Sequence, residues 1–364
     1  MKEIVKELKS YVPEEPLASV KARLGLDRVV RLSANENPYG TSPKVRQAIL
    51  DYVNNNDANY YPDGYAQSLR TALAQFWGFA EEQFVIGVGL DEVISLVSRV
   101  FLKEGDSVLV SQPAFSEYAL NGRIEGATIK TVNCNPETGH FDFDGLYEAV
   151  DASVKLVWLC NPNNPTGTYE TVEDMRAFIK RVPQACLVII DEAYIDFVTD
   201  VPVPTAMELL KEFPNVALMR TFSKAYGLAN YRVGYMIVAP ELANYVQTVR
   251  LPYNLNTLSQ VAAEAALADQ DFLAETIERN RRERDLWEAL LTELGIPFYH
   301  SQANFIYMKV GDEKALAEAW LKAGYQVRQG LGAGALRVTL PKAEDGVIMR
   351  QILKEYYINC TSRI

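Results

Sequence analysis

Hydrophobic and polar residues follow two different repeats through the middle of the chain, from residue 84 to 238. Short runs of consecutive apolar residues predict buried strands, whereas apolar residues recurring every three to four positions, as in 92–102 and 172–182, predict helices. The predicted strands cover residues 84–88, 107–110, 128–132, 156–160, 187–190, 216–219 and 233–238. This alternation indicates an α/β fold with a mostly parallel, seven-stranded sheet flanked by helices.

A different pattern follows residue 258. Helical spacing continues to about residue 294, and a compact mixture comes after it. This mixture has strands near 305–310, 326–328 and 336–339 and helices near 313–323 and 343–357. We therefore predict a large domain over 34–256 and a smaller α+β domain over 257–364. Residues 1–33 are predicted to form an arm that packs on the small domain or on a dimer partner.

Composition narrows the classes of function. The 36 lysines and arginines against 47 acidic residues give a net charge of −11, which argues against nucleic acid or an anionic membrane as a partner. No apolar run approaches the length of a membrane span, and the N-terminus lacks the apolar core of a signal peptide. We expect a cytoplasmic protein. Four widely spaced cysteines and only two histidines predict no metal site.

Polar motifs follow several predicted strands, where ligands bind in sheets of this kind. Asp191 closes the apolar run 187–190. A buried carboxylate is costly unless it meets a cation, and a protonated pyridine nitrogen is such a cation. Tyr194 can then donate to a phenolate oxygen on the same ring. The alternative is an ion pair between Asp191 and a lysine or arginine of the core.

The stretch from Thr221 to Arg232 carries a lysine among hydroxyl and small residues. Lys224 can form a Schiff base with a carbonyl cofactor, while Thr221, Ser223 and Arg232 can hold a phosphate. Taken alone, the stretch also fits a solvated lysine in a surface loop.

Other motifs are compatible with a ligand that carries a flat ring and a phosphate. A Gly-Val-Gly turn precedes Leu90 and Asp91, and their backbone amides can approach an anion, although the turn can be purely structural. Phe115 and Tyr118 can stack on a flat ring or belong to the core. Asn164 lies in a proline-rich turn that can aim its amide at the strand ends.

With NPNNPTG at 161–167, DEAY at 191–194 and SKAYGLA at 223–229, the chain resembles fold-type I pyridoxal-phosphate aminotransferases. Within them it is most similar to the histidinol-phosphate aminotransferase family, over residues 35–337. The resemblance implies pyridoxal 5'-phosphate as cofactor, bound by the large domain. It implies that Lys224 holds the cofactor as an internal aldimine and shuttles the proton, and that Asp191 pairs with the ring nitrogen.

The resemblance also assigns the remaining contacts. Tyr194 and Asn164 would bind the ring's phenolic oxygen, and Phe115 would stack on the ring. The phosphate would be held by Thr221, Ser223, Arg232 and the backbone amides of Leu90 and Asp91. Tyr61 would reach the cofactor phosphate of the neighbouring subunit, which implies a homodimer. Substrate contacts would come from Asn35, Asn37, Arg328 and Arg337.

The implied reaction is a ping-pong transfer between small molecules, an amino donor and a 2-oxo acid. We expect histidinol phosphate and 2-oxoglutarate to give imidazole acetol phosphate and glutamate. Aromatic amino acids are the alternative, because Leu17 stands where relatives with a phosphorylated substrate often carry a tyrosine. A further alternative is a phosphothreonine-type decarboxylase, which would use the same cofactor. A regulator's sensor domain is disfavoured by the acidic charge and the absence of a basic module.

Overall fold

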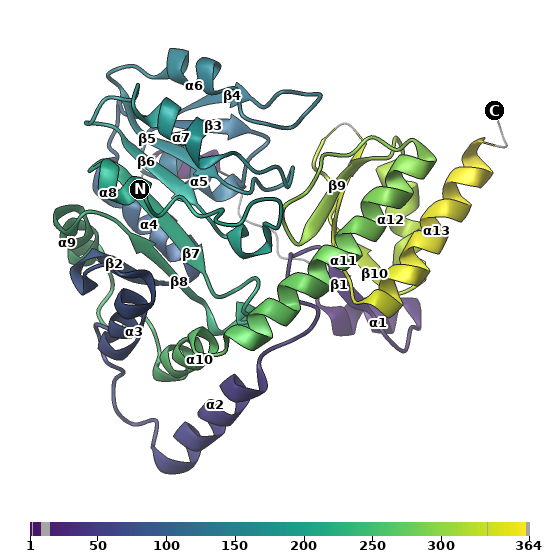
Figure 1. Ribbon diagram of the computed structural model, residues 1–364, viewed down its shortest axis with the longest axis horizontal. Coiled ribbons are helices and arrows are strands. Elements are labelled where there is room, and N and C mark those ends of the chain that lie inside the picture. Colours follow the sequence, from purple (N-terminus) through teal and green to yellow (C-terminus); the bar gives the residue numbers. More distant parts are fainter. Residues whose placement is uncertain (2, 9–14, 333, 362–364) are drawn as a thin grey trace.

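The computed structural model of the chain describes residues 1, 3–8, 15–332 and 334–361. Figure 1 shows a large body built around one sheet and a smaller body beside it. The long helix α11 (Gln270–Leu294) runs from the large body into the small one. The division at residues 33 and 256 stays a prediction.

Seven strands form the sheet of the large body, in the order β2-β8-β7-β6-β5-β3-β4. They are β2 (Phe84–Val88), β3 (Ser107–Gln112), β4 (Thr128–Asn133), β5 (Val154–Cys160), β6 (Leu187–Asp191), β7 (Val216–Thr221) and β8 (Val233–Ile237). Only β8 runs antiparallel to its neighbours, β2 and β7. The predicted mostly parallel, seven-stranded sheet is confirmed, with each strand end within two residues of the predicted position.

Helices cover both faces of this sheet. They are α3 (Gln67–Trp77), α4 (Gly89–Phe101), α5 (Ser116–Ile124), α6 (Phe143–Ala149), α7 (Val172–Ile179), α8 (Leu209–Glu212), α9 (Pro240–Val249) and α10 (Thr257–Leu267). The remaining helix of this body, α2 (Pro43–Asn55), lies farther from the sheet and packs against α10. Alternate residues of β6 enter two separate hydrophobic clusters: Val188 and Ile190 join one, and Leu187 and Ile189 the other. A strand buried on both faces reads as a continuous apolar run, which is why its position could be predicted.

The small body contains two short sheets. β9 (Phe305–Lys309) pairs antiparallel with β11 (Ala335–Thr339), and β10 (Tyr325–Val327) pairs parallel with β1 (Val30–Leu32). α12 (Glu313–Lys322) and α13 (Ala343–Thr361) cover them. The predicted strands and helices of this region are confirmed, whereas β1 was not predicted. This strand fastens the end of the N-terminal arm to the small body.

The rest of the arm is short and irregular where it is described. A 3-10 turn, η1 (Glu3–Lys6), lies against α5 of the large body, and α1 (Leu17–Leu24) precedes β1. Among the helices of the described chain, none has the length and apolar composition that crossing a bilayer requires. The cytoplasmic location stays a prediction. Cys134, Cys160 and Cys186 are buried free thiols, whereas the side chain of Cys360 lies outside the described residues.

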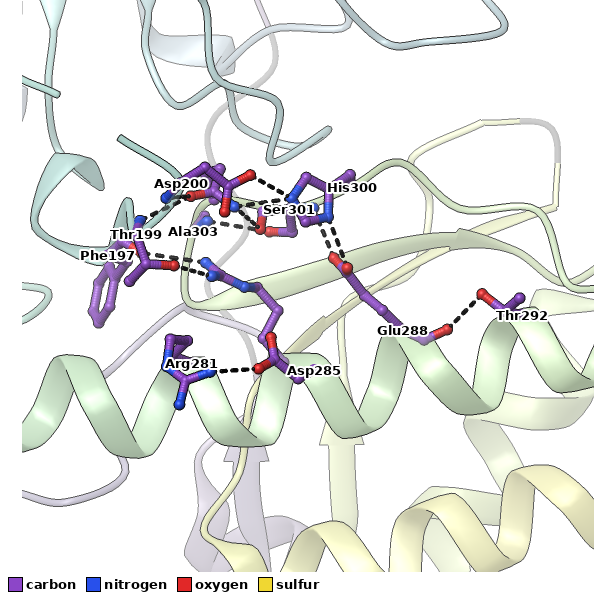
Figure 2. A network of polar contacts seen from close by, with 12 residues as sticks. Phe197, Thr199, Asp200, Arg281, Asp285, Glu288, Thr292, His300, Ser301 and Ala303 are labelled. Atoms are coloured by element: carbon purple, nitrogen blue, oxygen red, sulfur yellow. Dashed lines mark hydrogen bonds and ion pairs between the residues drawn. The ribbon is translucent and has the colours of Figure 1, made fainter. Parts of the chain in front are cut away.

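Polar contacts connect the loop after β6 with the small body (Figure 2). Arg284 of α11 donates to the carbonyl of Phe197 at 3.2 Å and to Thr199 Oγ1 at 2.5 Å. His300 Nε2 lies 2.8 Å from Asp200 Oδ2, and its Nδ1 lies 2.7 Å from Glu288 Oε2. The hydrogen bond with Glu288 raises the pKa of His300 to about 9, with Asp200 adding to the effect.

This network predicts a pH-dependent contribution to stability. Because the pKa of His300 is higher in the folded chain than in the unfolded one, its contribution is complete below about pH 6.5 and is lost as pH rises through about 9. The side chain is 58% exposed, so the effect is small. We expect His300→Ala to lower Tm by about 1 °C at neutral pH and by nearly nothing at pH 10.

The measurement is thermal unfolding followed by circular dichroism at both pH values. The other histidine, His140, is present in both proteins, so its titration cancels from the difference. An equal Tm difference at both pH values would show that His300 does not act through its charge.

Candidate active site

The carboxyl ends of β5, β6 and β7 meet at one edge of the sheet. Asp191, the last residue of β6, lies beside Cys160 of β5 and Met219 of β7. A cavity opens at this edge, lined by Leu90, Asp91, Phe115, Tyr118, Cys160, Asn164, Asp191, Ala193, Tyr194, Thr221, Ser223, Lys224 and Arg232. Apart from Tyr61, every predicted cofactor contact is in this lining.

Asp191 is a buried carboxylate whose two hydrogen-bond donors are neutral groups. The backbone N–H of Ala193 donates to Oδ1 at 3.0 Å, and the hydroxyl of Tyr118 donates to Oδ2 at 2.6 Å. Burial raises the pKa of Asp191 to about 6, although both hydrogen bonds lower it. The ionised carboxylate of Asp191 is therefore able to bind a cation in the cavity. In the part of the chain that the structure describes, no lysine or arginine forms an ion pair with Asp191, so the alternative of a core ion pair is not observed.

Lys224 lies in the loop after β7, with its amine in the same cavity. Nζ donates to the carbonyl of Ala34 at 3.1 Å and lies 5.5 Å from the ring centre of Tyr194. Burial lowers the pKa of Lys224 to about 8, and the charge of Arg337 lowers it further. A substantial fraction of the amine is therefore neutral near physiological pH and able to act as a nucleophile or a base. The solvated surface lysine considered above is thereby excluded.

The far end of the cavity is formed by the turn into α4 and the loop before β8. The N–H of Gly89 donates to the carbonyl of Arg232 at 3.0 Å, and both residues have positive φ angles, 71° and 54°. Arg232 also pairs with Asp91 at 2.9 Å. A guanidinium, the hydroxyls of Thr221 and Ser223, and the N-terminus of α4 together suit a phosphate.

A second cavity adjoins the first, because Phe115, Asn164, Tyr194 and Lys224 line both. Its other walls include Arg31, Arg328 and Arg337, which come from β1, the end of β10 and β11. Arg337 is buried, and it donates to Asn164 Oδ1 and to the carbonyl of Ser33, each at 2.5 Å. Three arginines therefore line this cavity on the side of the small body, together with Glu36, which pairs with Arg31.

The other predicted substrate residues lie nearby but differ in what they contact. Asn35 lines the second cavity and donates from Nδ2 to Tyr194 Oη at 3.0 Å. Asn37 is in neither lining; its amide donates to the carbonyl of Ala225 at 2.9 Å, next to Lys224. Its predicted substrate contact stays a prediction.

Tyr61 lies outside both cavities. It is 82% exposed and stacks on Tyr253, with ring centres 4.8 Å apart. Its predicted reach to a neighbouring subunit stays a prediction.

Sequence reasoning missed two residues of this region. Arg31 was not singled out because its strand, β1, was not predicted, although a basic residue just before the polar stretch 33–40 was a usable sign. It pairs with Glu36 at the rim of the second cavity. Tyr118 was left between ring stacking and core packing, and the structure shows a third role, hydrogen bonding to Asp191. Leu17 is in neither cavity lining.

Comparison with known proteins agrees with this arrangement. The family model for aminotransferase class I and II matches residues 27–351, which include every residue of both cavities. The chain belongs to this family. The predicted enzyme class is therefore confirmed, and the structure is that of an aminotransferase.

Individual relatives are similar along the whole length of this aminotransferase. The histidinol-phosphate aminotransferase of Limosilactobacillus fermentum is 49% identical over 98% of this chain and 99% of its own. That of Lactiplantibacillus plantarum is 48% identical over the same shares. The solved histidinol-phosphate aminotransferase of Sinorhizobium meliloti, in complex with pyridoxal-5'-phosphate, superposes with a TM-score of 0.88 at 26% identity, covering 99% of this chain and 98% of that one.

The turn at Gly89 yields a prediction for the phosphate end of the cavity. A Cβ at this position would lie 2.3 Å from Nη2 of Arg232, so Gly89→Ala must push the guanidinium aside. We expect this variant to bind pyridoxal phosphate about tenfold more weakly, because a charge-assisted hydrogen bond is lost. Isothermal titration calorimetry would measure the dissociation constant.

Gly105→Ala is the matched control. Gly105 also has a positive φ, 92°, but a Cβ there meets no atom within 4 Å. Both variants are expected to lose about 1–2 kcal/mol of unfolding free energy from backbone strain. Only Gly89→Ala should lose cofactor affinity. Equal affinities in the two variants would mean that Arg232 does not hold the phosphate.

Proposed function

We propose that this aminotransferase uses pyridoxal 5'-phosphate to exchange an amino group between histidinol phosphate and 2-oxoglutarate, forming imidazole acetol phosphate and glutamate. The observation that carries the proposal is the arginine-lined cavity beside Lys224. The names of the relatives that match nearly the whole chain support the same substrate.

The residues of the first cavity fit the cofactor by their chemistry. Asp191 is a buried carboxylate with neutral donors, and it suits a protonated ring nitrogen. Gly89 leaves space that a side chain would fill, so the guanidinium of Arg232 can lie against a phosphate. When bound, the cofactor supplies an aldehyde for amines to attack and a ring that accepts electrons from the substrate carbon.

The chain's own groups then have distinct tasks. Lys224, with its pKa lowered to about 8, supplies a neutral amine that would hold the cofactor covalently and, once released from it, would move a proton on and off the substrate carbon. Burial raises the pKa of Tyr194 to about 12, so its hydroxyl remains a hydrogen-bond donor. Phe115 lines both cavities and can cover the ring face. Asn164 is held in orientation by Arg337.

The second cavity suits a substrate with a phosphate. A phosphate dianion is best matched by several guanidinium groups, and Arg31, Arg328 and Arg337 surround this cavity. Arg31 is thus a candidate for the phosphate contact that Leu17 cannot make.

Half-reaction spectroscopy tests the proposal. Adding histidinol phosphate to the purified enzyme should bleach the visible absorbance of bound cofactor, and 2-oxoglutarate should restore it. Lys224→Ala is the control: it should retain cofactor without that absorbance and show no turnover, because the amine is replaced by a methyl group. Bleaching by phenylalanine or tyrosine but not by histidinol phosphate would assign the enzyme to aromatic amino acids. Release of carbon dioxide without an oxo product would indicate a decarboxylase.

We also propose that two copies form the active unit. Tyr60, Tyr61 and Tyr65 are exposed on one loop, and Tyr253, on which Tyr61 stacks, is half-exposed beside Leu251. Exposed apolar side chains gathered in this way are typical of a protein interface. Tyr61 would contact the cofactor phosphate of the second copy.

Sedimentation is expected to give twice the monomer mass of 40.8 kDa. Mixed dimers of Lys224→Ala with Tyr61→Ala should be more active than either variant alone, because one of their two sites has both residues intact. A monomer with full activity would contradict the proposed assembly.

A further inference from the structure

Tyr118 lines the first cavity and contacts Asp191, Trp158 and Phe115. It lies on α5 and is buried, and its hydroxyl donates to Asp191 Oδ2 at 2.6 Å. Its ring stacks on Trp158 of β5, with centres 4.6 Å apart and planes at 10°. The edge-on contact with Phe115 has centres 5.6 Å apart and planes at 81°. The hydroxyl is thus fixed by ring contacts on two sides.

We propose that Tyr118 is a positioning residue that holds Asp191 oriented and ionised to receive the protonated ring nitrogen of the cofactor. This inference rests on the proposed function and deepens it, since it names the residue through which Asp191 is controlled.

The orientation follows from the two donors to the carboxylate. The N–H of Ala193 binds Oδ1, and the hydroxyl of Tyr118 binds Oδ2, so rotation about the Cβ–Cγ bond would break both hydrogen bonds. A lysine or arginine in place of Tyr118 would neutralise Asp191 and compete with the ring nitrogen. A phenol stabilises the negative charge without cancelling it. Tyr118 therefore leaves Asp191 available to a cationic ligand.

The charge state follows from the surrounding groups. Burial raises the pKa of Asp191, Asp91 of α4 adds to this, and Lys224 beyond β7 opposes it. The hydroxyl of Tyr118 lowers the pKa of Asp191 more than Ala193 or Lys224 does. Burial raises the pKa of Tyr118 itself well above its ordinary value, and that of Cys160 of β5 too, so both stay protonated. Without the hydroxyl, Asp191 would take up a proton at higher pH.

Tyr118→Phe tests the inference, because the ring stacking remains and only the hydroxyl is lost. Cofactor dissociation on dilution of the holoenzyme, followed by tryptophan fluorescence, gives the dissociation constant. We expect an increase of about tenfold for Tyr118→Phe above the pKa of Asp191, and a larger one as pH falls through it. Tyr235→Phe is the control. That tyrosine is also buried and accepts from Trp77 Nε1 at 2.8 Å, outside the cavity, so its removal should leave the constant unchanged.

A double-mutant cycle separates positioning from packing. Asp191→Asn removes the carboxylate, so adding Tyr118→Phe to it should weaken cofactor binding little further. An equal weakening by Tyr118→Phe in both backgrounds would overturn the inference and make Tyr118 a packing residue. So would wild-type affinity and pH dependence in Tyr118→Phe. In either case the proposed function would stand, whereas wild-type enzyme that does not bind pyridoxal phosphate would refute the proposed function itself.

Discussion

The buried charge of Asp191, at the end of a strand, determines which groups can surround it. Moving a carboxylate from water into such a position costs several kcal/mol unless hydrogen bonds and a cation compensate. Its hydrogen bonds come from neutral groups, Tyr118 and Ala193, so the compensation is incomplete within the chain. The sheet concentrates the remaining polar groups at the same edge, where a cationic ring can complete it. Under the proposed function, the cationic ring of the cofactor would supply the compensation that the folded chain leaves open.

The sequence allowed the large sheet and its edge to be predicted for a specific physical reason. Strands buried on both faces are continuous apolar runs, and the carboxyl ends of parallel strands converge. Asp191, Asn164 and Lys224 could therefore be expected to meet, although they are far apart in the chain. The contacts of Tyr118 could not be predicted, because a buried tyrosine gives no sign in the sequence of where its hydroxyl points. Likewise, Asn37 binds a backbone carbonyl, which no side-chain pattern reveals.

The second cavity was harder to predict because it is built from both bodies of the molecule. The large body contributes Asn164 and Lys224, whereas the arginines lie on strands of the small body and of the arm. Pairing of β1 with β10 brings together residues separated by almost the whole chain. β10 was predicted as a strand, but no local pattern in the sequence indicates which distant segment pairs with it. The polar contacts of Arg284 and His300 lie at the junction of the same two bodies.

The hydrogen bond between Arg337 and Asn164 has a further consequence. An amide has one end that accepts and one that donates, and the guanidinium can only donate. Arg337 therefore fixes the polarity of Asn164, with its NH₂ group left for a partner in the first cavity. An anion that draws Arg337 toward itself in the second cavity would loosen this constraint. The orientation of an amide that lines both cavities thus depends on an arginine that lines only the second.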